Sequence, residues 1–201
     1  MKYIEDNLEN ATLEWLKDIG YSVAFGPDIS FDGVARERKE EAGYSDVVLK
    51  ERLKEAILKI NHDIPEEARE EALTKVLNVP FSSPVLIEAN EAFHKMLFEG
   101  VDVTYRDENG MTRGDKVYLF DFNNPNNNDF LAVNQFTIIE NRNRRPDILI
   151  FVNGIPLAIF ELKNPADSNA TSTGAFNQLQ TYKKDIPSLF AYNELCIIAD
   201  H

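Results

Sequence analysis

The segment Arg144–Pro165 reads RRPDILIFVNGIPLAIFELKNP and contains two short apolar runs on either side of Asn153-Gly154. Runs of this length that are rich in Ile, Val, Leu and Phe are typical of strands buried on both faces of a sheet. Asn-Gly between them predicts a tight β-hairpin. The open end of this hairpin nevertheless carries three charged residues, Asp147, Glu161 and Lys163. Charged side chains are rarely buried without a partner, so their presence here needs an explanation.

The register of the hairpin decides whether the three charges can meet. Glu161 and Lys163 are two residues apart, so on a strand they point to the same face. With a plain two-residue turn at Asn153-Gly154, Asp147 points away from that face. A three-residue loop, Val152–Gly154, shifts the pairing by one residue and turns Asp147 toward Glu161. We expect this loop, with Gly154 at the positive φ that it requires, although a bulge in one strand would also bring Asp147 to the face of Glu161 and Lys163.

Three converging charges of this kind predict metal-assisted hydrolysis of a phosphodiester. Asp147 and Glu161 offer carboxylate oxygens, which suit a hard divalent cation such as Mg²⁺ held together with waters. Such an ion polarises a phosphoryl oxygen and lowers the pKa of a bound water. Lys163 could orient that water or stabilise negative charge on the phosphate. The alternative is purely structural: Asp147 caps a turn, and Glu161 and Lys163 form an exposed ion pair at a strand end.

The rest of the sequence predicts one α/β or α+β domain over residues 1–201, with a central mixed β-sheet flanked by helices. Residues from about 1 to 100 are mostly helical, an N-terminal elaboration, and residues from about 101 to 201 form the sheet-rich part. Helical spacing of apolar residues predicts helices over 8–19, 48–60, 65–76, 84–99 and about 174–184. Further strands are expected over 21–25, 101–105, 116–122, 130–139 and 195–199.

Composition and charge restrict the class of protein. The single cysteine, Cys196, excludes a disulfide scaffold, and the acidic stretch 1–10 does not resemble a signal peptide, so we expect a cytoplasmic protein without membrane association. The net charge of −13 argues against a freestanding DNA-binding protein. Cationic residues are nevertheless concentrated around the hairpin and the helix after it, where they could bind phosphates: Arg142, Arg144, Arg145, Lys163, Lys183 and Lys184.

Taken together, the motifs resemble a known family of nucleases. Pro-Asp, then Glu-x-Lys, then Gln178 and Tyr182 in a Q-x-x-x-Y pattern on the next helix resemble the PD-(D/E)xK nucleases of the RecB-like branch. LENATLEWLKDIGY, DFNNPNNNDFLAVNQFTIIE and AFNQLQTYKKDIPSLFAYNE resemble the N-terminal part of the R subunit of type I restriction endonucleases. The resemblance covers essentially the whole chain. It implies a restriction-endonuclease-like core and an Mg²⁺-dependent endonuclease domain, a type I site-specific deoxyribonuclease that hydrolyses double-stranded DNA.

The resemblance also implies roles for individual residues at the hairpin. Asp147 and Glu161 would be the metal-binding acids, and the backbone carbonyl of Leu162 would add a ligand. Lys163 would be the catalytic lysine. The cofactor would be Mg²⁺, with Mn²⁺ as a substitute.

Two further parts of the family motif lie on the predicted helices. Gln178 and Tyr182 would assist cleavage and contact DNA near the site. A further acid is expected on the first helix, where Glu9 is the best match and Glu5 and Glu14 are weaker ones.

The family also implies partners and a longer parent protein. R subunits continue into ATP-driven translocase domains, which are expected to lie beyond this sequence, so ATP would be used there and not here. Double-stranded DNA and the methyltransferase and specificity subunits would be the partners. Two other functions stay open. One is a non-catalytic docking or DNA-gripping module on a nuclease fold, which the intact triad disfavours. The other is a stand-alone DNA repair nuclease, which the acidic surface disfavours.

Overall fold

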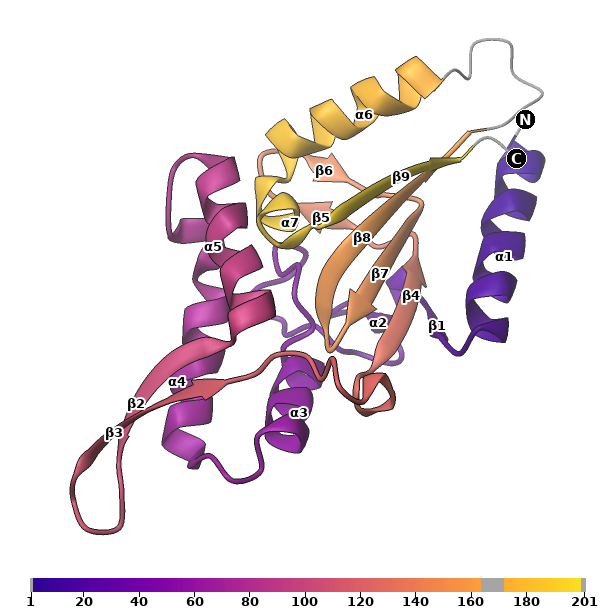
Figure 1. The fold of residues 1–201 in the computed structure, drawn as a ribbon. Coiled ribbons are helices and arrows are strands. Elements are labelled where there is room, and N and C mark those ends of the chain that lie inside the picture. Colours follow the sequence, from indigo (N-terminus) through magenta and orange to yellow (C-terminus); the bar gives the residue numbers. More distant parts are fainter. Residues whose placement is uncertain (1, 164–171, 200–201) are drawn as a thin grey trace.

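The computed structural model describes residues 2–163 and 172–199, and a five-stranded mixed sheet lies at its centre (Figure 1). The strand order is β1-β4-β7-β8-β9. β1 runs parallel to β4 and β8 runs parallel to β9, whereas β7 is antiparallel to both of its neighbours in the sheet, β4 and β8. The strands are β1 (Ser22–Phe25), β4 (Phe130–Asn134), β7 (Ile148–Val152), β8 (Ile155–Leu162) and β9 (Leu195–Ala199). The expected mixed α/β architecture is therefore confirmed.

Seven α-helices accompany the sheet within the described residues, and most were expected. They are α1 (Lys2–Asp18), α2 (Gly26–Ile29), α3 (Lys50–Ile60), α4 (Glu66–Leu77), α5 (Leu86–Glu99), α6 (Ser172–Asp185) and α7 (Pro187–Tyr192). Two short 3₁₀ helices, η1 (Val79–Phe81) and η2 (Pro125–Asn127), complete the helical segments. None of the helices in this part of the chain is long and apolar enough to cross a membrane.

Alternating residues of the central strands bury two separate apolar faces. On one face, Leu13 of α1 packs in a small cluster with Ile148, Ile150, Ala158 and Leu162. On the other face, alternate residues such as Leu149 and Ile159 belong to the main core, which also contains residues of α3 to α7. Ile148 and Ile150 of β7 therefore face α1, and Leu149 and Phe151 face the main core.

The turn of the central hairpin differs from the expected one. Val152 pairs with Ile155 across a two-residue turn, so the prediction of a three-residue loop is wrong. Both turn residues have positive φ, 52° at Asn153 and 78° at Gly154, as a type I′ turn requires. The predicted positive φ of the glycine is therefore confirmed.

A β-bulge in β8 corrects the register that the short turn would otherwise impose. Phe151 pairs with Pro156 and Ile150 pairs with Ala158, which leaves Leu157 as an extra residue. Beyond the bulge, Ile148 lies opposite Phe160. The next residues outward, Asp147 and Glu161, are then opposite one another and project to the same face.

Other differences concern the length and position of strands. The strand predicted over 130–139 ends at Asn134, because Gln135 takes a φ of 56°, and β5 (Ile138–Ile139) then pairs with β6 (Asn143–Arg144). β2 (Val101–Arg106) and β3 (Thr112–Val117) form a separate hairpin that extends away from the sheet (Figure 1). The last strand was expected correctly, but it lies at the sheet edge, so Cys196 is exposed.

Candidate functional site

The structure brings the three charged residues of the hairpin together at its open end. Asp147 Oδ2 accepts a hydrogen bond of 2.7 Å from the backbone N–H of Leu162. Lys163 Nζ donates to Glu161 Oε1 at 2.7 Å. The Glu161 side chain is only 1% exposed, so this ion pair is not a solvated surface pair. Because Glu161 lies on the face of the main core, the purely structural alternative of an exposed strand-end pair does not fit.

Helix α6 covers this group and fixes the position of the lysine. Lys163 Nζ also donates to Gln178 Oε1 at 2.8 Å, and Gln178 Nε2 donates to Tyr182 Oη at 2.7 Å. Gln178 and Tyr182 are four residues apart, so they lie one turn apart on the same face of α6. Burial, and next the nearby charge of Glu161, raise the pKa of the Tyr182 hydroxyl, which keeps it neutral. A chain of hydrogen bonds thus connects Glu161 to the middle of α6.

Glu9 reaches the same end of the sheet from α1, on the opposite face. Its carboxylate accepts hydrogen bonds from Asn134 Nδ2 and, at 2.7 Å, from Gln135 Nε2. The charge of Glu9 also contributes to the pKa of Asp147, so the two carboxylates are electrostatically coupled. Glu14 is exposed, and the Glu5 side chain lies outside the described residues. Among the first-helix acids whose side chains are described, Glu9 is the one that faces the site.

Asn134 and Gln135 were not predicted as site residues. Besides holding Glu9, Gln135 donates its backbone N–H to the Asp147 carbonyl at 3.1 Å, so it links both acids. It does so with a φ of 56°, a conformation that residues other than glycine seldom adopt and that is often found at functional sites. The sequence signal was a polar pair at the end of an apolar strand. It was overlooked because the apolar residues Phe136 and Ile138 continued the strand pattern.

The electrostatics of the group favour a cation. Burial, and then the charge of Glu161, raise the pKa of Asp147 to about 7, although the Leu162 N–H and Lys163 act in the opposite direction. Two carboxylates that disfavour each other's charge are characteristic of sites that hold a metal ion, because a divalent cation reverses this effect.

The donor set fits a partly hydrated ion. Within residues 2–163 and 172–199, no group of three or more His, Cys, Asp or Glu side chains could hold a metal. Asp147 and Glu161 would therefore need backbone, water or substrate oxygens to complete the shell, which is the usual arrangement for Mg²⁺. That the Leu162 carbonyl is one of these ligands stays a prediction.

Comparison with known proteins identifies the family. The family described as "Type I restriction enzyme R protein N terminus" matches residues 2–201. The chain belongs to this family. It is 38% identical over 198 residues to the type I restriction enzyme HindI endonuclease subunit of Haemophilus influenzae, covering 98% of this chain and 18% of that protein. It is 39% identical over 197 residues to a protein named as the MjaIXP endonuclease subunit of Methanocaldococcus jannaschii, covering 96% of this chain and 18% of the relative.

The resemblance expected from the motifs is thus confirmed at the level of the family. This R-subunit N-terminal domain spans less than a fifth of the length of these relatives, 18% in both cases. The comparisons assign no role to any residue, so the positions of the site residues described above rest on the structure alone.

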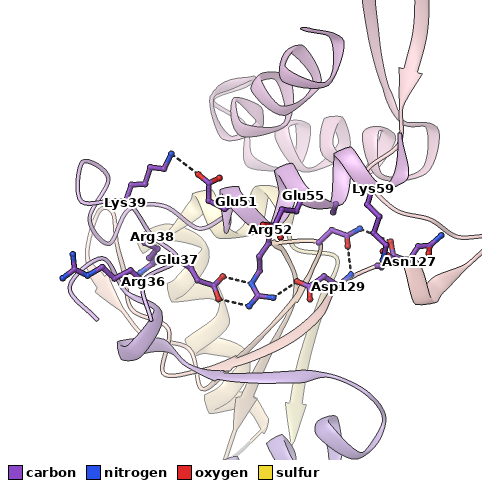
Figure 2. Close-up of a pocket in the computed structure, with 13 residues that line it drawn as sticks. Arg36, Glu37, Arg38, Lys39, Glu51, Arg52, Glu55, Lys59, Asn127 and Asp129 are labelled. Atoms are coloured by element: carbon purple, nitrogen blue, oxygen red, sulfur yellow. Dashed lines mark hydrogen bonds and ion pairs between the residues drawn. The ribbon is translucent and has the colours of Figure 1, made fainter. Parts of the chain in front are cut away.

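A pocket of about 690 Å³ in this domain lies at the other end of the hairpin and holds none of the predicted site residues (Figure 2). Arg52 of α3 lies between two acids there, with Nε and Nη2 on Glu37 and Nη1 on Asp129. Asn153 in the hairpin turn accepts from the Asp129 N–H and donates to the Leu119 carbonyl. Arg52 of α3 is thus connected through Asp129 to Asn153, and these contacts fasten the turn to α3.

The raised pKa of Asp147 predicts that, without a metal ion, the charged form of this side chain destabilises the folded domain. An acid with a folded-state pKa near 7 and an ordinary value of 3.8 binds its proton more tightly when folded. Its contribution to stability therefore falls as the pH rises from about 4 to 7. We expect Asp147→Asn to increase the free energy of unfolding at about pH 8 in EDTA by on the order of 1–3 kcal/mol, less than the full shift implies because the carboxylate is partly exposed. The gain should be smaller at about pH 5.

Urea unfolding at the two pH values measures this effect. Asp107→Asn is the matched control, because the side chain of Arg113 lowers the pKa of Asp107 and the sign of the effect reverses. That control should lose stability at the higher pH. A loss for Asp147→Asn at high pH would contradict the electrostatic account of the site.

Proposed function

We propose that this domain is the Mg²⁺-dependent endonuclease domain of a type I restriction R subunit, with a PD-(D/E)xK core, and that it hydrolyses phosphodiester bonds of double-stranded DNA. The observation that carries the proposal is the convergence of Asp147, Glu161 and Lys163 at one end of a buried hairpin, with Glu161 and Lys163 joined at 2.7 Å. Membership of the R-subunit family supports it independently.

Each side chain has a distinct part in the proposed reaction. Asp147 and Glu161 would hold the ion, with the Leu162 carbonyl as a further ligand. When bound, the ion supplies Lewis acidity and a water of lowered pKa. Lys163, held between Glu161 and Gln178, is positioned to orient the attacking water or to stabilise negative charge on the phosphate.

The remaining predicted residues support this arrangement. The Tyr182 hydroxyl accepts a hydrogen bond from the Gln178 amide, and Gln178 in turn accepts one from the Lys163 ammonium group, so Tyr182 helps to orient Lys163. Glu9 is a third acid near Asp147, and its two amide partners keep it in place.

The surroundings of the domain are also part of the proposal. The methyltransferase and specificity subunits would deliver the DNA in the cytoplasm, and ATP would be used by other domains of the longer parent protein. Delivery by an assembly is consistent with a net charge of −13 on a DNA-cleaving domain.

Calorimetric titration with Mn²⁺ tests the metal site. We expect this chain to bind Mn²⁺, and Asp147→Asn and Glu161→Gln each to weaken binding by roughly a hundredfold, since each removes one of two anionic ligands. Asp115→Asn, on exposed β3, is the control with the same loss of charge and should bind normally. Unchanged affinity in both site variants would leave a non-catalytic docking or DNA-gripping module as the better description.

A further inference from the structure

A second hollow of about 610 Å³ adjoins the candidate site, because Gln178 and Tyr182 belong to its lining. We call it the arginine pocket, and it is lined by Thr137, Asn143, Arg144, Arg145, Gln178, Thr181 and Tyr182. Its lining contains two guanidinium groups, hydroxyls and amides, and no carboxylate. Because Gln178 is bonded to Lys163, one wall of this pocket is part of the network that fixes the proposed catalytic lysine.

Arg144 is held in a fixed position before any ligand arrives. Its Nε donates to Asp185 Oδ2 at 2.7 Å, and its Nη2 contacts the same oxygen. Asp185 ends α6, and its backbone carbonyl accepts the Asn141 N–H at 3.0 Å. The Asn141 side chain donates in turn to the Lys184 carbonyl at 2.9 Å. The segment that carries Arg144 is thus fastened to the end of α6.

Arg145 differs because it makes no ion pair with any residue that the structure describes, and its side chain is exposed. Because Asp185 neutralises Arg144, Arg145 is the arginine of this pocket whose charge no described acid neutralises. With no carboxylate in its lining, the pocket is therefore positively charged, which suits an anionic partner.

The chemistry of the arginine pocket suits a phosphate. The planar guanidinium donates two parallel hydrogen bonds to phosphate oxygens, and Thr and Asn side chains are common additional donors to the DNA backbone. Arg145 is two residues from Asp147, so their Cα atoms are at most about 7 Å apart. Successive phosphates advance about 3.4 Å along the duplex axis. A phosphate in this pocket would therefore be close to the phosphate at Asp147 along the same strand.

We propose that the arginine pocket binds a non-scissile backbone phosphate of the DNA strand that is cut, and that Asp185 is a positioning residue for Arg144. The neighbouring position of the scissile phosphate rests on the proposed nuclease function, whereas DNA binding by the pocket does not. The contact is with the phosphate backbone and carries no sequence information.

Binding of this chain to a duplex of about 30 base pairs, measured by fluorescence anisotropy in EDTA between about 50 and 200 mM salt, tests the proposal. Arg144→Gln and Arg145→Gln should each weaken binding about tenfold and reduce the slope of log K against log salt by about 1. Arg106→Gln, an exposed arginine of the β2–β3 hairpin, is the matched control and should change neither quantity.

Asp185→Asn separates positioning from charge. It makes the protein less negative, so attraction by net charge alone predicts tighter binding, whereas loss of the Arg144 anchor predicts binding that is weaker by about threefold or more. Tighter binding, or arginine variants that behave like Arg106→Gln, would overturn the proposal, and so would a wild-type chain that does not bind the duplex. Arg145 is exposed, so Arg145→Gln keeps the test valid if Arg144→Gln unfolds. A domain that binds DNA through these arginines but binds no Mn²⁺ would refute the proposed nuclease function and leave only DNA binding by the arginine pocket standing.

Discussion

We expect alanine in place of Asp147, Glu161 or Lys163 to reduce DNA cleavage by the assembled restriction enzyme by roughly a thousandfold or more. Removing either acid takes away one of the two proposed anionic metal ligands, and removing Glu161 also takes away the ion-pair partner of Lys163. Removing the lysine leaves Glu161, which is 1% exposed, without its ammonium partner. The measurement is the rate at which DNA carrying the recognition site is cut, with ATP hydrolysis followed in the same samples.

Hydrolysis of ATP should persist in all three variants, because this domain spans only 18% of its relatives and the proposed translocase lies in the remainder. Gln178→Ala provides a graded comparison. It removes one partner of Lys163 but leaves the 2.7 Å contact with Glu161, so a loss of about tenfold is expected. Loss of ATP hydrolysis in folded triad variants would contradict the separation of the two activities, and wild-type cleavage by Lys163→Ala would contradict the role of the lysine.

Most of the helices and strands were predictable from sequence because they depend on local periodicity and turn residues, whereas the short elements α2, α7, β5 and β6 were not predicted. The register of the hairpin was not predictable in the same way, because it depends on both the number of turn residues and the presence of a bulge in one strand. The face of Asp147 was predicted correctly, but the structure reaches it through a bulge and not through the expected three-residue loop. A signal for the true arrangement was present: Pro156 lies inside the second apolar run, and proline within a strand is confined to edges and bulges.

The candidate site was predictable where its residues are close in sequence. Asp147, Glu161 and Lys163 lie in one hairpin, and Gln178 and Tyr182 lie on one helix. Glu9 and Gln135 are far apart in sequence, and no periodicity connects a helix on one face with the end of a central strand. Glu9 was found only through the family resemblance, and its amide partners were missed. Arg144 and Arg145 were noticed only as part of a basic segment, because the ion pair with Asp185 depends on the folded position of α6.

Gly154→Val should have the largest effect on stability of any change at the hairpin turn. From sequence, the expected penalty is only the strain of positive φ in a β-branched residue, on the order of 1–2 kcal/mol. The structure adds a steric overlap, because a Cβ at Gly154 would lie 2.4 Å from the Leu49 carbonyl oxygen and 2.9 Å from the Leu53 nitrogen. Both atoms belong to the backbone at the start of α3, and the Leu49 N–H donates to the Gly154 carbonyl at 2.8 Å. The turn cannot accept a side chain unless it separates from α3.

Comparison with Gly110→Val separates the steric overlap at Gly154 from backbone strain, because Gly110→Val has the strain alone. Gly110 lies in the turn of the β2–β3 hairpin with a φ of 77°, almost that of Gly154, and a Cβ there would meet nothing within 4 Å. We expect Gly110→Val to lower the free energy of unfolding by about 1–2 kcal/mol. Gly154→Val should lower it by on the order of 3–5 kcal/mol, a large part of the stability of a typical domain. Urea unfolding followed by circular dichroism compares the two. Equal losses would mean that the turn is not held against α3, and that the register of Asp147 opposite Glu161 is set by the bulge alone.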